Sequence, residues 1–243
     1  MYKYSPQSHL HLINPIPVWK RTLTDEELGQ PLSEFNEKLI EIARDFYHEW
    51  AIEVPDERHT VAKSNFPAEY YEELDKREFF YQANYPAVGK WHAVQTNNFL
   101  NIDEPEIMLL RSIILSDYKK MLTEYFNHEF DGVQYYNENH QVTESWMQFY
   151  KNGDYKVQHN HLRYSEELHL KNIWAGGYYL KDGEPDIRQP YSGRFGFNAR
   201  NKTYLVKPTE GMILLFPGDA VHEVFPFYGK SERICCNFNL STK

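Results

Sequence analysis

Two histidines one residue apart, His159 and His161, stand in the segment YKVQHNH. Side chains on a β-strand alternate between its two faces, so both imidazoles would point to one side and could bind one metal ion. The spacing alone is weakly specific, because His9 and His11 repeat it without supporting residues nearby. A metal-site interpretation of the first pair therefore needs a further ligand from elsewhere in the chain.

His222 is the candidate for that further ligand. It follows the apolar stretch GMILLFP and a turn, and it begins another predicted strand. In a jelly roll, several strands can separate two parts of one site along the chain, so the distance in sequence from His161 to His222 is acceptable. The three histidines together predict a metal centre.

Arg233 begins the last predicted strand and is the candidate for binding an anion. An arginine buried inside a barrel needs an anionic partner, and a dicarboxylate could offer two oxygens to its guanidinium fork. The strand has a polar face with Arg233, Cys235, Asn237 and Asn239, and an apolar face with Ile234, Cys236, Phe238 and Leu240. The alternation leaves open whether the polar face lines a lumen or meets solvent.

The elements that must position these residues begin with a helical part. Apolar residues recur at helical spacing over 32–50 and over 107–125, which predicts two amphipathic helices. The prolines of segment 13–19 favour a short extended segment near a sheet edge. Residues 51–90 are polar, and we expect loops there with a short helix at 67–76.

After about residue 130, short β-type segments alternate with turns rich in Gly, Asn, Asp and Pro. The predicted strands are 143–150, 155–161, 173–180, 193–199, 203–208, 211–217, 222–227 and 232–240. This pattern predicts an α+β, mainly β fold, in which two N-terminal helices pack against a jelly roll. We expect residues 1–243 to form a single domain, with a helical and loop part at 1–135 packed on a jelly-roll core at 140–243.

Composition limits the possible partners of the chain. The 243 residues carry a formal net charge of −9, which argues against unaided binding to nucleic acid. No apolar run reaches the roughly 18 residues of a membrane helix, and the N-terminus lacks the apolar stretch of a signal peptide. Cys235 and Cys236 are adjacent on one strand and point apart, so no disulfide between them is expected, and a cytoplasmic location is predicted.

The order of these motifs resembles the Fe(II)- and 2-oxoglutarate-dependent oxygenases. The segments that carry the resemblance are SWMQFYKNGDYKVQHNH, GGYYL, GMILLFPGDAVHEVFP and ERICCNFN, with KWHAVQTNNFL upstream. The chain is most similar to the 2OG-Fe(II) oxygenases common in phages and bacteria, and more distantly to prolyl hydroxylases. The resemblance implies a double-stranded β-helix (jelly roll, cupin-like), the cofactors Fe(II) and 2-oxoglutarate, and as partners O2 and a small-molecule or peptide substrate.

Roles for individual residues follow from that resemblance. His159 and His222 match the two iron-binding histidines, and Arg233 matches the basic residue that pairs with the distal carboxylate of 2-oxoglutarate. Tyr179 matches a tyrosine whose hydroxyl reaches the same carboxylate, and Tyr150 matches a tyrosine near the cosubstrate. The implied reaction is an oxidation, by default a hydroxylation, coupled to decarboxylation of 2-oxoglutarate.

Two positions depart from the superfamily pattern. Most members carry a carboxylate two residues after the first histidine, and here that position is His161. Either His161 is the third ligand, or an acidic side chain reaches the metal instead; the candidates are Asp154, Glu166 and Asp219. Cys235 stands where related enzymes often have Ser or Thr, and a thiol donates a hydrogen bond poorly.

Two other classes of function stay open. A cupin-type metal dioxygenase that does not use 2-oxoglutarate would suit three histidines, although it would leave Arg233 without a task. A non-catalytic jelly-roll binding module with a structural metal is the other, although closed structural zinc sites usually take four protein ligands, often cysteines. The segments 51–100 and 162–172 are expected to shape the entrance to the site.

Overall fold

The computed structural model describes residues 10–13, 16–53, 81–82, 94–95, 99–129, 140–161, 171–199 and 201–242. The elements of the N-terminal half are β1 (Leu10–Ile13), β2 (Ile16–Thr22), α1 (Asp25–Leu28), α2 (Leu32–Glu53), β3 (Tyr81–Gln82), β4 (Val94–Gln95), the 3-10 helix η4 (Phe99–Asn101) and α4 (Pro105–Glu129). Those of the C-terminal half are β5 (His140–Tyr150), β6 (Lys156–His159), β7 (Lys171–Lys181), β8 (Phe195–Ala199), β9 (Lys202–Val206), β10 (Met212–Pro217), β11 (His222–Val224) and β12 (Arg233–Thr242).

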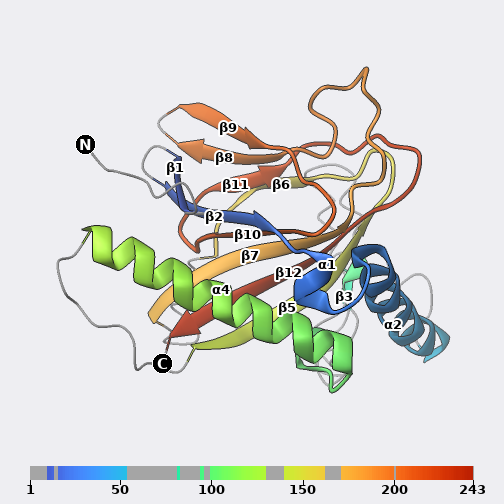
Figure 1. Cartoon of the computed structure of the whole chain (residues 1–243). Coiled ribbons are helices and arrows are strands. Elements are labelled where there is room, and N and C mark those ends of the chain that lie inside the picture. Colours follow the sequence, from blue (N-terminus) through green and yellow to red (C-terminus); the bar gives the residue numbers. More distant parts are fainter. Residues whose placement is uncertain are drawn as a thin grey trace, which may run out of the picture.

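The strands form two antiparallel sheets (Figure 1). Among the described residues, the larger sheet has the order β1-β2-β10-β7-β12-β5-β4-β3 and the smaller one has the order β6-β11-β8-β9. From β5 onward the chain contributes β5, β7, β10 and β12 to the larger sheet and β6, β8, β9 and β11 to the smaller one. This confirms the predicted jelly roll, whose lumen lies between the two sheets.

Helices α2 and α4 cover the outer face of the larger sheet, as Figure 1 shows for α4 across β7, β12 and β5. The apolar positions predicted for the second helix are buried: Ile107, Leu110, Ile114, Tyr118 and Met121 are 0% exposed. Helix α2 buries Phe35 and Leu39 in the same layer, and its predicted positions Phe46 and Trp50 have side chains outside the described residues. Both predicted helices are therefore confirmed, and they close the larger sheet from solvent on this side.

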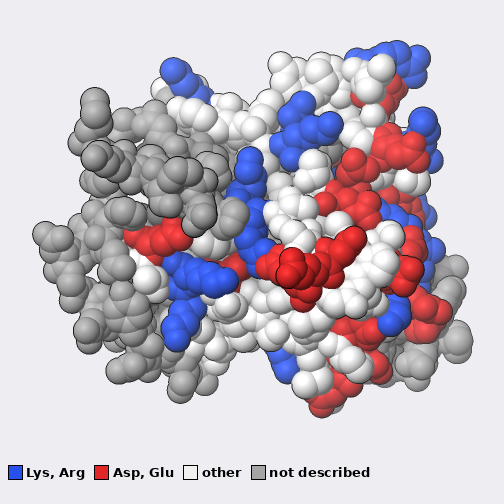
Figure 2. All heavy atoms as spheres, viewed as in Figure 1, with Lys and Arg blue, Asp and Glu red and all other residues white. Residues whose placement is uncertain are grey.

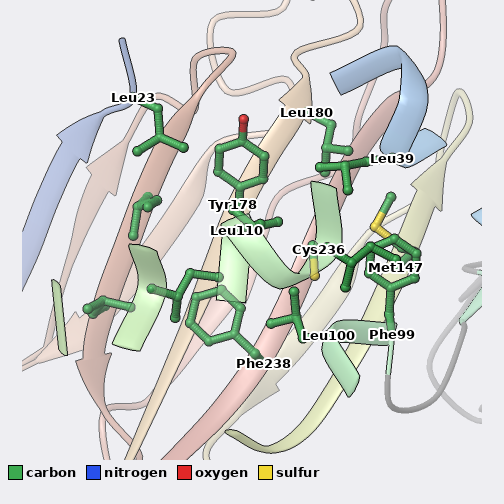
Figure 3. Close-up of a cluster of buried hydrophobic side chains, with 14 of the residues drawn as sticks. Leu23, Leu39, Phe99, Leu100, Leu110, Met147, Tyr178, Leu180, Cys236 and Phe238 are labelled. Carbon is green, nitrogen blue, oxygen red and sulfur yellow. The ribbon is translucent and has the colours of Figure 1, made fainter. Parts of the chain in front are cut away.

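Strand β12 lies between two separate hydrophobic cores. Its residues Ile234, Cys236, Phe238 and Leu240 join the core under the helices, part of which Figure 3 shows around Cys236 and Phe238. On the opposite face, Arg233 and Cys235 are 2% exposed and Asn239 is 1% exposed. The question left by the sequence is thereby decided, because the polar face of β12 lines the lumen and does not meet solvent.

The N-terminal strands lie at one edge of the larger sheet. The extended segment expected at 13–19 is observed as β2, which continues to Thr22 and pairs with β10, while β1 takes the outermost position. Arg21 at the end of β2 donates from Nε to Asp117 Oδ2 of α4 at 2.6 Å. This buried ion pair fixes the edge of the sheet to the helix that covers it.

Several expectations concern parts of the chain outside the described residues. These are the short helix at 67–76, most of the entrance segments, and the alternative ligand Glu166. Among the described helices, none has the length and apolar character needed to span a membrane. On the face shown in Figure 2, basic side chains lie among acidic ones, in keeping with ion pairs such as Lys38–Glu106 and Arg44–Glu232. That the whole chain forms one domain stays a prediction, as does its location in the cytoplasm.

Candidate active site

Three histidines converge in the lumen of the jelly roll. His159 ends β6, His161 follows two residues later, and His222 begins β11 directly opposite His159 in the strand register. Each ring offers one nitrogen to a common point, and these nitrogens all lie within 4.8 Å of one another. The Nε2 atoms of His161 and His222 are 3.4 Å apart. Two nitrogen ligands about 2.1 Å from one metal ion have a separation of about 3 Å, so this spacing fits a shared ion.

Hydrogen bonds fix the orientation of all three rings. The acceptors of their Nδ1 atoms are Val157 O (2.8 Å from His159), Asn239 Oδ1 (2.6 Å from His161) and Ala220 O (2.8 Å from His222). A carbonyl oxygen can only accept, so the proton of each neutral ring sits on Nδ1 and the lone pair on Nε2. The three lone pairs are therefore held toward the point where the rings meet.

The surroundings keep these imidazoles neutral. Burial lowers the pKa of His159 to about 3 and that of His161 to about 4, with the positive charge of Lys156 acting in the same direction on both. Burial also lowers the pKa of His222 well below its ordinary value. A metal ion binds the neutral form of histidine, so the rings are already in the protonation state that ligation requires.

The two acidic alternatives to His161 within the described residues, Asp154 and Asp219, do not share this cluster. Asp154 is buried in a turn, where its Oδ2 accepts from the backbone N–H of Lys151 at 2.7 Å, and Asp219 is exposed. Within the described residues, the group of potential ligands in the lumen consists of the three histidines. The geometry therefore favours His161 as the third ligand, and its role stays a prediction.

Arg233 lies on the lumen face of β12, between two tyrosines. Its guanidinium carbon is 4.6 Å from the ring centre of Tyr150 and 5.2 Å from that of Tyr179. Burial raises the pKa of both phenols above the ordinary value, so both keep their protons and can donate. Nε and Nη1 of Arg233 are buried and have no hydrogen-bond partner among the described residues. A buried cation with unused donors fits a carboxylate ligand.

Tyr178 and Tyr179 are separated as strand alternation requires. The hydroxyl of Tyr178 donates to Asn36 Oδ1 of α2 at 2.6 Å, in the core under the helices. Tyr179 belongs to the other core and faces the lumen. The structure thus places Tyr150, Tyr179 and Arg233 together, as the sequence analysis expected.

A further row of polar lumen residues was missed by the sequence analysis. On β5 these are Glu144, Trp146 and Gln148, which lie opposite Asn239, Asn237 and Cys235 of β12. Asn237 donates from Nδ2 to Gln148 Oε1 at 2.6 Å. Gln148 Nε2 and Trp146 Nε1 are buried donors that have no hydrogen-bond partner within the described segments. The signal was present in TESWMQFY, because alternate residues of that strand share the face of Tyr150.

Comparison with known proteins agrees with this site. A family model described as "Putative 2OG-Fe(II) oxygenase" matches residues 144–239, a span that contains every lumen residue described above. No curated protein matches the chain. AviO1 from Streptomyces viridochromogenes Tue57 has a similar structure, with a TM-score of 0.50 at 10% identity over 93% of this chain and 89% of that one. A Pseudomonas putida prolyl-4-hydroxylase gives a TM-score of 0.49 at 13% identity, over 93% and 92% of the two chains.

The jelly roll, its three histidines and the match over residues 144–239 make this chain similar to the 2OG-Fe(II) oxygenases, which are a class of enzymes. The family model itself covers less than half of the chain. The cofactors of this family are Fe(II) and 2-oxoglutarate. The residues present fit both, because the lumen holds three neutral imidazoles for the metal and a buried guanidinium, two nitrogens of which have no partner in the described part of the chain, for a carboxylate.

Proposed function

We propose that this enzyme couples the decarboxylation of 2-oxoglutarate by O2 to the oxidation, by default the hydroxylation, of a small molecule or a peptide side chain. His159, His161 and His222 would hold Fe(II). The bound iron supplies the one-electron chemistry of O2, which no side chain can provide. The protein contributes ligand geometry, orientation of the cosubstrate and exclusion of water.

Arg233 would bind the distal carboxylate of 2-oxoglutarate. Its two unpaired nitrogens are buried, so a carboxylate would be held in a dry site where charge-assisted hydrogen bonds are strong. Tyr150 and Tyr179 flank the guanidinium and remain protonated, so their hydroxyls would donate to the same group. A single positive charge between two neutral phenols suits one carboxylate.

One observation carries the proposal: the lumen that gathers three imidazole lone pairs also holds a buried arginine, two nitrogens of which have no hydrogen-bond partner among the described residues. A structural metal site has no need of that arginine. An oxygenase that binds a 2-oxo diacid needs both features in one cavity.

A dioxygenase that does not use 2-oxoglutarate is the second candidate. The feature that favours it is the ligand set, because His161 replaces the carboxylate found in most of the superfamily. In that case, Arg233 would bind the substrate itself.

Anaerobic titration of the Fe(II)-loaded protein with 2-oxoglutarate separates the two candidates. We expect a weak visible charge-transfer band, because chelation of iron by a 2-oxo acid produces one. His222→Ala should bind no iron, while Arg233→Met should bind iron and require at least about 100-fold more 2-oxoglutarate for the same band, since a buried charge-assisted pair contributes about 3 kcal/mol.

Arg194→Met is the matched control, because Arg194 donates from Nε to the carbonyl of Pro190 at the surface. It should leave the titration unchanged. Iron binding without a band in the unmodified protein would favour the second candidate and contradict the first.

A further inference from the structure

The carboxylate of Glu144 is linked to the candidate metal centre by two consecutive hydrogen bonds. Nδ1 of His161 lies 2.6 Å from Asn239 Oδ1, and Asn239 Nδ2 donates to Glu144 Oε2 at 3.0 Å. Asn239 is 1% exposed and directly opposite Glu144 in the register of β12 and β5. Because a carboxylate can only accept, the amide of Asn239 must turn its oxygen toward His161.

His161 differs from the other two histidines in this respect. Nδ1 of His159 and of His222 each donate to a main-chain carbonyl, which is neutral. Nδ1 of His161 instead donates to a side chain whose other end meets a negative charge. The charged link thus reaches the one histidine that stands where most of the superfamily has a carboxylate.

We propose that Glu144 is a positioning residue of the metal centre, which acts through Asn239 to orient His161 and to return part of the negative charge that the histidine ligand lacks. The inference rests on the proposed function, in that it takes His161 as a metal ligand. Carboxylates that contact a ligating histidine through its second nitrogen make the ring a stronger donor and fix its orientation. Here the same effect is transmitted through one buried amide.

The positive charge of Lys156 opposes the negative charge of Glu144 at the metal centre. Burial lowers the pKa of Lys156 to about 7, and the charge of Glu144 acts on it in the opposite direction. The register of β6 and β11 shifts between His222 and Val224, so that Lys156 lies opposite Val224 on the strand that ends in His159. The charge of Lys156 disfavours a cation among the histidines, and Glu144 offsets it.

Glu144→Gln isolates the charge from the geometry. The glutamine Oε1 can still accept from Asn239 Nδ2, so this hydrogen bond between β5 and β12 can be kept while the charge is lost. We would measure Co(II) binding to the full chain, without 2-oxoglutarate, by competition with a chelator and by the visible d–d absorption of the complex. The expected result is an affinity lower by about 10-fold or more, together with a shifted Co(II) spectrum.

Two variants serve as controls. Glu144→Asp keeps the charge, so its Co(II) affinity should stay within about threefold of that of the unmodified protein. The Co(II) affinity of Glu144→Gln should fall outside this range. Glu223→Gln removes a carboxylate adjacent to His222 in sequence, where Glu223 Oε1 accepts from Asn198 Nδ2 at 2.8 Å, and it should change Co(II) affinity by no more than about twofold.

The inference is overturned if Glu144→Gln binds Co(II) with the affinity and spectrum of the unmodified protein. It is also overturned if Glu223→Gln lowers the Co(II) affinity as much as Glu144→Gln does, because the loss would then come from the change in net charge of the protein. If the unmodified chain itself takes up no Co(II), the proposed function fails; if it binds Co(II) and Glu144→Gln matches it, only the role of Glu144 fails.

Discussion

At the scale of single residues, the lumen is arranged before any ligand arrives. The three imidazoles are neutral, and each is held through Nδ1 by a protein oxygen. The arginine is charged, and two of its nitrogens have no partner among the described residues. Such a site loses little side-chain freedom on binding, because folding has already ordered its groups.

The histidines predict an acid-sensitive metal-free protein. In the unfolded chain they take up protons near 6.5, while in the folded chain His159 and His161 resist protonation until about 3 and about 4. The unfolded state therefore binds more protons in this range, and the free energy of unfolding falls as the pH falls from about 6.5 to about 4. Each histidine contributes about 1.4 kcal/mol per pH unit, which urea unfolding with a chelator present would measure.

His222→Phe provides the comparison for this slope. Burial lowers the pKa of His222 as well. Between pH 5 and pH 6, the free energy of unfolding of the variant should therefore change less steeply with pH, by the contribution of one histidine. An unchanged slope would contradict the assignment of a buried neutral imidazole at position 222.

Residue types and spacing identified the candidate ligands, which the structure brings together, but not the residues that hydrogen-bond to them. His159, His222 and Arg233 could be found because imidazoles suit a metal ion and a guanidinium suits a carboxylate, and because their order resembles that of the oxygenases. Asn239 and Glu144 carry no such chemical signature, and their contact depends on the register of β5 against β12. Register is set by packing across the whole sheet, which local sequence does not specify.

At the scale of elements, one face of β7 packs in the core under the helices and the other face lines the lumen. Its neighbours Gly176 and Gly177 point in opposite directions. A side chain at Gly176 would meet Phe238 Cε2 at 2.5 Å and Leu214 O at 2.7 Å, in the core under the helices. One at Gly177 would first meet Asn237 Oδ1 at 3.1 Å, on the lumen side.

These glycines make a matched pair of variants. Gly176→Ala should destabilise the protein by about 1–3 kcal/mol, because a backbone oxygen cannot move aside for the new methyl group. Its melting temperature should fall by about 5 °C or more. Gly177→Ala should melt within about 2 °C of the unmodified protein, because the Asn237 side chain can yield. Equal losses in the two variants, measured by thermal unfolding, would contradict the assignment of the two faces.

Hydrophobic periodicity predicted the elements well where one face is buried. The stripes of α2 and α4 and the alternation in β12 match the observed cores. The shift of register between β6 and β11, which brings Lys156 opposite Val224, was not predictable, because the local sequence does not mark where a strand takes one extra, unpaired residue. The pairing of β2 with β10 was equally hidden, since it joins residues distant in the sequence.

At the scale of the whole molecule, the site connects the two sheets. His159 and His222 belong to the smaller sheet, while Arg233 and Asn239 belong to the larger one. The bond between His161 and Asn239 crosses the lumen from one to the other. A ligand that contacts the metal and Arg233 together would add a second link, so binding should stabilise the whole fold.

Thermal unfolding tests this coupling. At about 100 times its dissociation constant, a dicarboxylate such as succinate should stabilise the protein by about 2.7 kcal/mol and raise the melting temperature by roughly 5–10 °C. Butyrate, which has one carboxylate, should have a much smaller effect at the same concentration. Arg233→Met should abolish the difference, and it should not melt lower than the unmodified protein without ligand, because it removes an uncompensated buried charge. A persistent response to succinate in Arg233→Met would contradict the role of Arg233.

The fixed orientation of the three imidazoles also bears on which ion a cell would deliver to this protein. Neutral nitrogen donors bind the later first-row ions more tightly than Fe(II), with copper at the top of the series. Rings tethered at Nδ1 cannot rearrange to exclude a competitor of similar size. The site itself would not select Fe(II), so the supply of metal decides the occupant. We expect protein purified from zinc-rich medium to contain zinc and to be inactive until the zinc is removed and Fe(II) is added under anaerobic conditions.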